Sequence, residues 1–249
     1  MVGHKSKENH IIRKVNQKVG KAIQKYHLIE EGDRILVGLS GGKDSMVLLE
    51  TLAGRLKFHP LKYELAAIHV SLKSQPYSVD LEYLKSFAQS LEVQFIHKII
   101  DVDLFDQKNN NPCFVCSWNR RKALFETAQE SGFNKLSLGH HLDDAIETLL
   151  MNMVFQASIG SMPPLLKMFE GKLSVIRPLM LLSENEIKEF AAIRRFKNEI
   201  KLCRFEKESK RKDIKNLIFQ LVELYPNART NIYASMTNIL EEYLPEEKY

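Results

Sequence analysis

The sequence is poor in cysteine and lacks any long apolar stretch. No apolar run approaches the ~20 residues that a membrane-spanning helix needs, which argues against an integral membrane protein. Residues 1–20 carry charges throughout and contain no apolar segment of the kind found in secretory signals. Three is a small and odd number of cysteines, which argues against a disulfide framework and favours metal ligation or catalysis. We therefore expect a cytoplasmic protein with no membrane partner.

Internal repeats and low-complexity tracts are also absent. A chain of 249 residues can hold one α/β domain of ordinary size with additions at its ends. The formal net charge of +5 permits an anionic partner without requiring one.

Apolar runs typical of buried strands alternate with amphipathic segments typical of helices. Five strands are predicted, at residues 34–39, 63–70, 93–100, 135–138 and 174–176. The alternation predicts an α/β fold with a doubly wound parallel sheet, and helical additions precede and follow it. Ligands of such sheets bind beyond the carboxyl ends of the strands.

A glycine-rich segment follows the first predicted strand and leads into a helix. It reads Ser40-Gly41-Gly42-Lys43-Asp44-Ser45. Adjacent glycines let the backbone approach a ligand closely, and the helix N-terminus offers N–H groups and a positive dipole end. With two hydroxyls and one lysine, the segment is predicted to bind phosphate.

Spacing excludes two common phosphate-binding motifs. A Walker A loop would need glycine at Val37 and Ser or Thr at Asp44, and the dinucleotide motif would need glycine at Ser40. A carboxylate such as Asp44 in a phosphate site indicates a bridging Mg²⁺ ion. The alternative interpretation is an ordinary tight turn from strand to helix.

A second polar cluster follows the fourth predicted strand. His140, Asp143, Asp144 and Glu147 have the spacing i, i+3, i+4, i+7, which places them on one face if all are helical. Paired carboxylates at this point are suited to hold hydrated Mg²⁺ over a triphosphate. The alternative is that an aspartate simply caps the helix.

The cysteines form a pair and a single residue. Cys113 and Cys116 precede a predicted helix at 117–131, and Cys203 lies far downstream. Thiolates near a helix N-terminus and basic residues have lowered pKa values, which suits ligation or nucleophilic chemistry. Three cysteines fit a [4Fe–4S] cluster with one open iron. Zinc with a histidine ligand, a redox pair and buried structural cysteines are the alternatives.

Several of these segments together resemble one enzyme family. Residues 40–45 resemble the SGGxDS loop of the PP-loop ATP pyrophosphatases, and residues 138–148 resemble the LGHxxDDxxET segment of the PP-loop tRNA-modifying enzymes, which include lysidine synthetases and tRNA thiolases. Residues 113–121 resemble the CxxCxxxRR segment of the tRNA 2-thiocytidine synthesis family. Residues 162–164 and 176–179 resemble its GMPP and IRPL segments. The resemblance covers roughly residues 30 to 205.

The resemblance implies an activity, cofactors and site residues. ATP would adenylate the C2 oxygen of a tRNA cytidine, which is then replaced by sulfur from a donor such as a cysteine desulfurase. The residues implied to bind ATP and Mg²⁺ are Ser40, Gly41, Gly42, Lys43, Asp44, Ser45, His140, Asp143 and Asp144. Cys113, Cys116 and Cys203 would ligate the cluster, and Asp44, Asp143, Cys113 and Cys116 are the implied catalytic residues.

The resemblance also implies domain boundaries and leaves alternative functions open. The expected regions are an N-terminal helical region at 1–30, a PP-loop ATP-binding domain at 31–196 and a basic, helical extension at 197–249. The later segment has one cysteine, Cys203, where better-known members carry a second C-x-x-C. A 2-thiouridine or lysidine-forming PP-loop enzyme, or a non-catalytic zinc-containing RNA-binding module, is the alternative.

Two basic segments are candidates for contact with RNA. The predicted helix at 8–28 has a basic face, which is either solvated or bound to RNA. The segment 194–215 is basic and surrounds Cys203. The predicted helices at 214–224 and 228–244 could pack within the chain or form the contact of a homodimer.

Overall fold

A computed structural model describes residues 2–58, 61–73, 79–103, 112–197 and 210–245. The chain divides into two compact units. The first comprises residues 1–141 and 163–207, and the second comprises 142–162 and 208–249. No helix in the described ranges is long and apolar enough to cross a membrane.

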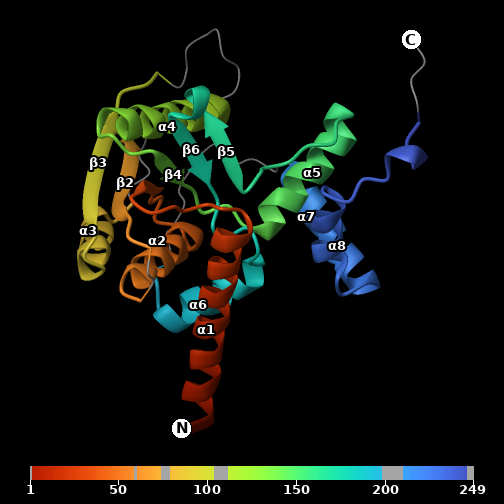
Figure 1. Cartoon of the computed structure of the whole chain (residues 1–249), viewed down its shortest axis with the longest axis horizontal. Helices are drawn as coiled ribbons and strands as arrows, with labels where there is room; N and C mark the ends of the chain where they lie inside the picture. Colours follow the sequence, from red (N-terminus) through yellow and green to blue (C-terminus); the bar gives the residue numbers. More distant parts are fainter. Residues whose placement is uncertain (1, 59–60, 74–78, 104–111, 198–209, 246–249) are drawn as a thin grey trace. The chain divides into compact units, whose positions relative to one another are not determined.

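A six-stranded sheet forms the centre of the first unit (Figure 1). Its strands are β1 (Arg34–Gly38), β2 (Glu64–Leu72), β3 (Gln94–Ile100), β4 (Lys135–Ser137), β5 (Leu165–Met168) and β6 (Leu173–Ile176). The spatial order is β3-β2-β1-β4-β6-β5, and every pairing except β5–β6 is parallel. Because β1 leads outward to β2 and β4 leads outward to β6, the switch point of the sheet lies between β1 and β4.

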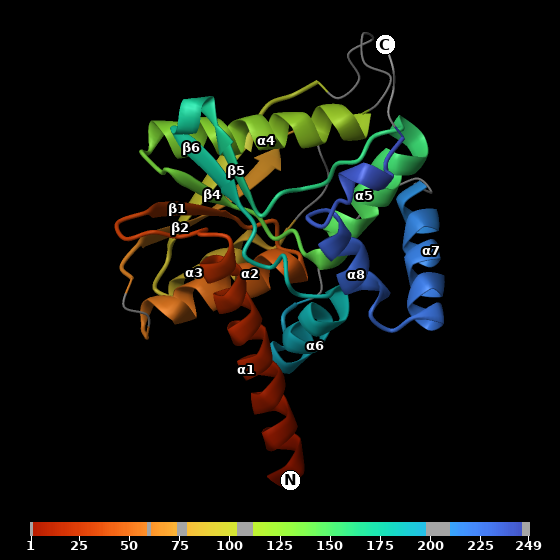
Figure 2. The same ribbon diagram turned by 45° about the vertical axis from the view of Figure 1, so that its right-hand side comes forward.

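Helices cover both faces of this sheet (Figure 2). The helices α1 (Val2–Lys25), α2 (Lys43–Leu56), α3 (Leu81–Ser90) and α6 (Glu184–Arg194) share one apolar core, while α4 (Pro112–Glu130) packs on the opposite face. The buried strand residues are largely aliphatic, as expected for a sheet covered on both sides. The predicted doubly wound α/β fold is confirmed.

The second unit is helical. It contains α5 (Leu142–Gln156), α7 (Lys210–Leu224), α8 (Ala228–Ser235) and the 3₁₀ turn Glu241–Tyr243. Its apolar core is small and is built from Leu142, Ile146, Ile214 and Ile218. Two ion pairs also join the helices of this unit, Asp143 with Arg229 and Glu147 with Arg211.

Three sequence predictions are corrected by the structure. β5 was not predicted, because it is a four-residue edge strand whose two central residues are exposed, which is too short to give a clear pattern. α4 begins at Pro112 and not at Ser117, since proline is well tolerated at the first helical position. α8 ends at Ser235, well before Leu244.

A capping box at Ser183 begins α6 and also joins α1 to α6. Ser183 and Glu186 exchange hydrogen bonds, and Glu186 accepts ion pairs from Lys14 at 3.0 Å and Lys18 at 2.7 Å. Burial alone would raise the pKa of Glu186, but the bonds from Lys18, Ser183 and Lys14 outweigh burial and lower it. Part of the basic face of α1 is therefore used inside the unit.

We predict that Glu186→Ala lowers the free energy of unfolding by about 1 kcal/mol at neutral pH, through loss of the cap and the ion pairs. Because the folded-state pKa of Glu186 is lowered, this contribution is present above the ordinary carboxyl pKa and is lost as pH falls through the lowered value. Urea unfolding at a series of pH values measures it. The exposed Glu189→Ala on the same helix is the control, and an equal loss at every pH would contradict the prediction.

Candidate nucleotide site

The loop between β1 and α2 has the geometry of an anion cradle. Gly41 has φ 93°, a conformation that favours glycine. The Gly42 N–H donates to Ser40 Oγ at 3.3 Å, and Ser45 Oγ donates to the Gly42 carbonyl at 2.8 Å. Among the residues that the structure describes, no side chain caps α2, so its first N–H groups remain available to a ligand.

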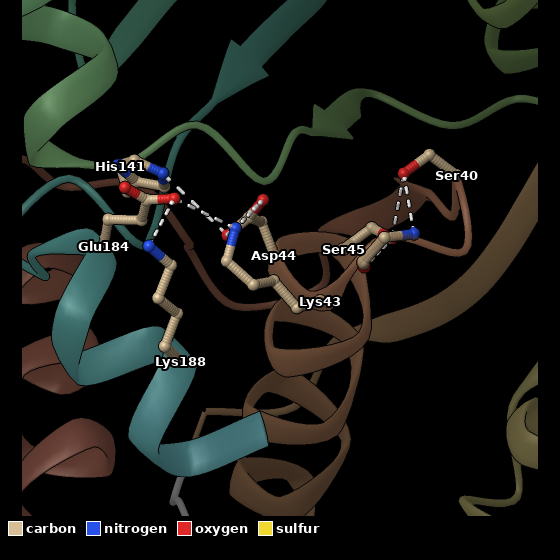
Figure 3. Close-up of polar contacts among 8 residues, drawn as sticks. Ser40, Lys43, Asp44, Ser45, His141, Glu184 and Lys188 are labelled. Carbon is tan, nitrogen blue, oxygen red and sulfur yellow. Dashed lines mark hydrogen bonds and ion pairs between the residues drawn. The ribbon is translucent and has the colours of Figure 1, made fainter. Parts of the chain in front are cut away.

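Charged side chains surround the start of α2 (Figure 3). Lys43 Nζ lies 3.2 Å from the Asp44 carboxylate and 3.5 Å from Glu184 Oε1, and Glu184 also pairs with Lys188 at 3.2 Å. His141 Nε2 lies 3.8 Å from Asp44 Oδ1. A phosphate bound in the loop would therefore compete with Asp44 and Glu184 for the Lys43 ammonium group.

The loop after β4 lies directly against this cradle. A Cβ atom on Gly139 would come within 3.1 Å of Asp44 C and Ser45 N, which are backbone atoms and cannot swing aside. Only glycine allows this close approach without displacing the first turn of α2. The two loops that flank the switch point, 40–45 and 139–141, are therefore in contact.

A buried arginine directly after β6, the strand next to β4, connects three segments. Arg177 Nε donates to His140 Nδ1 at 3.3 Å, and its guanidinium donates to the Pro163 carbonyl. Its backbone N–H donates to the Pro164 carbonyl at 2.9 Å. Burial lowers the pKa of Arg177, and the nearby Arg121 lowers it further. Because Nδ1 of His140 accepts a bond, its remaining proton resides on Nε2.

His69 on β2 is a further buried polar residue at this edge of the sheet. Its Nδ1 donates to the Leu39 carbonyl at 2.8 Å and so supports the start of the glycine-rich loop. Burial lowers the pKa of His69, which keeps the ring neutral near pH 7. The sequence pattern did not single out His69, Arg177 or Glu184 as site residues. A histidine inside an apolar strand and an arginine directly after one were the available signals.

The predicted acidic pair lies in the second unit. Asp143 and Asp144 are in the first turn of α5, while His140 precedes that helix, so the four polar residues do not share one helical face. Asp143 is buried and accepts a 2.6 Å hydrogen bond from Arg229 Nε. Glu147 pairs with Arg211 at 3.1 Å. Joint binding of Mg²⁺ by Asp44, Asp143 and Asp144 stays a prediction.

The cysteine pair occupies the start of α4. Cys113 is exposed and Cys116 is half-buried, one turn apart on the helix. Cys203 lies outside the described residues. In the described part of the chain, no three His, Cys, Asp or Glu side chains gather as a metal site, so the predicted ligand set stays a prediction.

Comparison with known proteins establishes the family. A family model described as PP-loop domain matches residues 8–222. The tRNA-cytidine(32) 2-sulfurtransferase of Shewanella sediminis is 36% identical over 242 residues, which are 94% of this chain and 75% of that protein. The chain belongs to the PP-loop family. Within this family, the same sulfurtransferase from Yersinia pestis is 32% identical, over 96% of this chain and 78% of that protein.

A solved PP-loop structure has the same fold. The U34-tRNA thiolase NcsA from Methanococcus maripaludis, with its [4Fe–4S] cluster, aligns with a TM-score of 0.77. The alignment covers 97% of this chain and 82% of that chain at 24% identity. At this identity the likeness concerns the fold, and the predicted PP-loop fold is thereby confirmed.

We predict that Gly139→Ala weakens ATP binding by about 10-fold or more, because the added methyl group displaces the first turn of α2. Gly54→Ala, in the same helix, is the matched control. A Cβ there meets nothing within 4 Å, and the change should stabilise the helix by about 0.5–1 kcal/mol with ATP affinity unchanged. Calorimetric ATP titration of both folded variants measures this. Equal ATP affinities would contradict the assigned position of the loop.

Proposed function

We propose that this PP-loop protein is an ATP-dependent tRNA sulfurtransferase. In this proposal it adenylates the C2 oxygen of a cytidine and replaces that oxygen with sulfur, in the cytoplasm. The observation that carries the proposal is identity of 32–36% to proteins named tRNA-cytidine(32) 2-sulfurtransferase over nearly the whole chain. The anion cradle at Ser40–Ser45 supports the ATP-dependent step.

The chemistry requires ATP because the C2 oxygen of cytosine is a poor leaving group. Attack of this oxygen on the α-phosphorus would form a bond to AMP and release pyrophosphate. Lys43 and the N–H groups at the start of α2 would balance the charge that develops on pyrophosphate. A sulfur nucleophile would then attack C2, and AMP would leave with the oxygen.

Asp44 is suited to hold the Mg²⁺ that accompanies ATP. Its Oδ1 atom is buried and makes no hydrogen bond to the described residues, although Lys43 Nζ lies 3.2 Å away. A buried carboxylate oxygen beside a phosphate cradle is a fitting ligand for a hard cation. Asp144 and Asp143 are the further candidates, and Asp143 would have to exchange Arg229 for the ion.

The cysteines are proposed to hold a [4Fe–4S] cluster. Cys113 and Cys116, on the exposed start of α4, would supply two ligands and Cys203 the third. When bound, such a cluster would present one iron without a protein ligand, which could hold sulfur received from a donor such as a cysteine desulfurase. A persulfide on one of the cysteines is the alternative route.

We predict that the protein, incubated with tRNA, ATP, Mg²⁺ and a sulfur donor, forms 2-thiocytidine and releases pyrophosphate. Lys43→Ala should reduce the rate by about 100-fold, because one charged donor to the leaving group is lost. Lys57→Ala, at the other end of α2, is the matched control and should retain activity. Nucleoside mass spectrometry and a pyrophosphate assay measure both products. Thiolated uridine or lysidine would identify another PP-loop enzyme, and ATP-independent RNA binding alone would indicate a binding module.

We further predict about four irons and four sulfides per chain after anaerobic purification. Cys113→Ser, Cys116→Ser and Cys203→Ala should each lose the cluster, while the neighbouring Ser117→Ala should keep it. Iron, sulfide and zinc analysis with visible absorption spectra measures this. A colourless protein that holds zinc after anaerobic reconstitution would exclude the cluster and leave the adenylation step to be judged separately.

A further inference from the structure

Two aromatic side chains lie exposed on one face of the first turns of α4. Phe114 and Trp118 are four residues apart, so they are neighbours on the helix surface. Phe114 is 61% exposed and Trp118 is 51% exposed. Single exposed apolar side chains are common on proteins and need no explanation. Two adjacent aromatic rings require further evidence before a role is assigned.

The part of α4 that carries these rings has charged residues of one sign. Residues 112–125 contain Arg120, Arg121 and Lys122 and no aspartate or glutamate. The Lys122 ammonium lies 5.7 Å from the centre of the Trp118 ring, a cation–π contact. The first carboxylate on the helix is Glu126, whose Oε1 lies 3.7 Å from Lys122 Nζ. The aromatic pair is thus bordered by cations, which suits a polyanionic partner.

The aromatic pair also lies at the edge of the sheet where the parallel strands have their carboxyl ends. Since α4 follows the parallel strand β3, its N-terminus is at the carboxyl edge, where the Ser40–Ser45 loop also lies (Figure 2). Arg121 is near enough to Arg177 to affect its pKa, which places the middle of α4, one turn beyond Trp118, close to the end of β6. Phe114 directly follows Cys113, and Cys116 lies between the two aromatic residues in sequence.

We propose that Phe114 and Trp118 form a stacking platform for unpaired bases of an RNA loop, next to the cysteine pair. Unpaired bases can stack on aromatic rings while lysine and arginine bind the adjacent phosphates. Exposed aromatic rings followed by three consecutive cations, with the nearest carboxylate of the helix, Glu126, one turn beyond Lys122, favour RNA over a protein partner. The inference rests on the proposed function, and it adds the residues that would hold the loop beside the sulfur-transferring group.

The chain contains a single tryptophan, so its fluorescence reports on this platform alone. The probe is an RNA hairpin whose unpaired loop contains cytidine, compared with a fully paired duplex of the same length. We expect the hairpin to quench Trp118 fluorescence in a saturable manner and the duplex to leave it nearly unchanged. Equal quenching by hairpin and duplex would overturn stacking and indicate contact with phosphates only.

Substitutions separate stacking from charge. Trp118→Leu and Phe114→Leu should each weaken hairpin binding by about 5- to 150-fold, measured by anisotropy of labelled RNA. Phe58→Leu is the matched control, because Phe58 is 91% exposed and follows the C-terminus of α2, at the end of that helix away from the Ser40–Ser45 loop. Lys122→Gln should reduce the dependence of affinity on salt, whereas Trp118→Leu should leave that dependence unchanged. Circular dichroism verifies that each variant is folded.

Failure of this inference can be told apart from failure of the proposed function. If wild-type protein forms 2-thiocytidine and both leucine variants bind the hairpin normally, the platform is wrong and the function stands. If no thionucleoside forms but the leucine variants lose hairpin affinity, the platform stands and the function is wrong. Loss of activity with normal hairpin affinity would point to docking of a protein sulfur donor and would overturn the platform.

Discussion

The first turn of α2 must remain open to a ligand while the loops beside it hold it in place. A helix start without a side-chain cap leaves polar N–H groups without partners, and this is stable only where solvent or an anion can reach them. The structure meets this requirement with close backbone packing and with side-chain bonds to the carbonyls that precede the turn. A Cβ atom on Gly139 would lie only 3.1 Å from the backbone of this turn. His69 Nδ1 donates to the carbonyl of Leu39, just before the glycine-rich loop.

The second constraint is the buried guanidinium of Arg177. One side chain links the loop after β4 to the residues that lead into β5. Arginine suits this position because its planar fork can donate to several carbonyl and ring acceptors at once and remains charged when buried. The segments around Pro163, Arg177 and His140 are far apart in the sequence. This contact explains why they occur together, and it orients His140 with its Nε2 proton directed away from Arg177.

The central sheet was predictable because its strands are short apolar runs in strict alternation with helices. The Ser40–Ser45 loop was equally recognisable, since glycines, hydroxyls and a lysine between a strand and a helix have few other uses. β5 could not be predicted, because four residues at a sheet edge, two of them exposed, are too few to show a pattern. The pairing of Lys43 with Glu184 was also beyond sequence analysis, because it joins residues 141 positions apart through the packing of α6 on α2. Likewise, the basic face of α1 gave no sign that Lys14 and Lys18 pair with Glu186.

The ion pair between Asp143 and Arg229 has a consequence for the order in which the chain acquires its structure. The two residues are 86 positions apart, and Asp143 is buried. A carboxylate cannot be buried at acceptable cost before its cation arrives. During synthesis, α5 therefore emerges well before its partners in α7 and α8, and it must wait with Leu142 and Ile146 uncovered. The first unit is complete in sequence at residue 207, whereas the second also needs residues 208–249. Closure of the second unit is thus timed by the C-terminal segment of the chain.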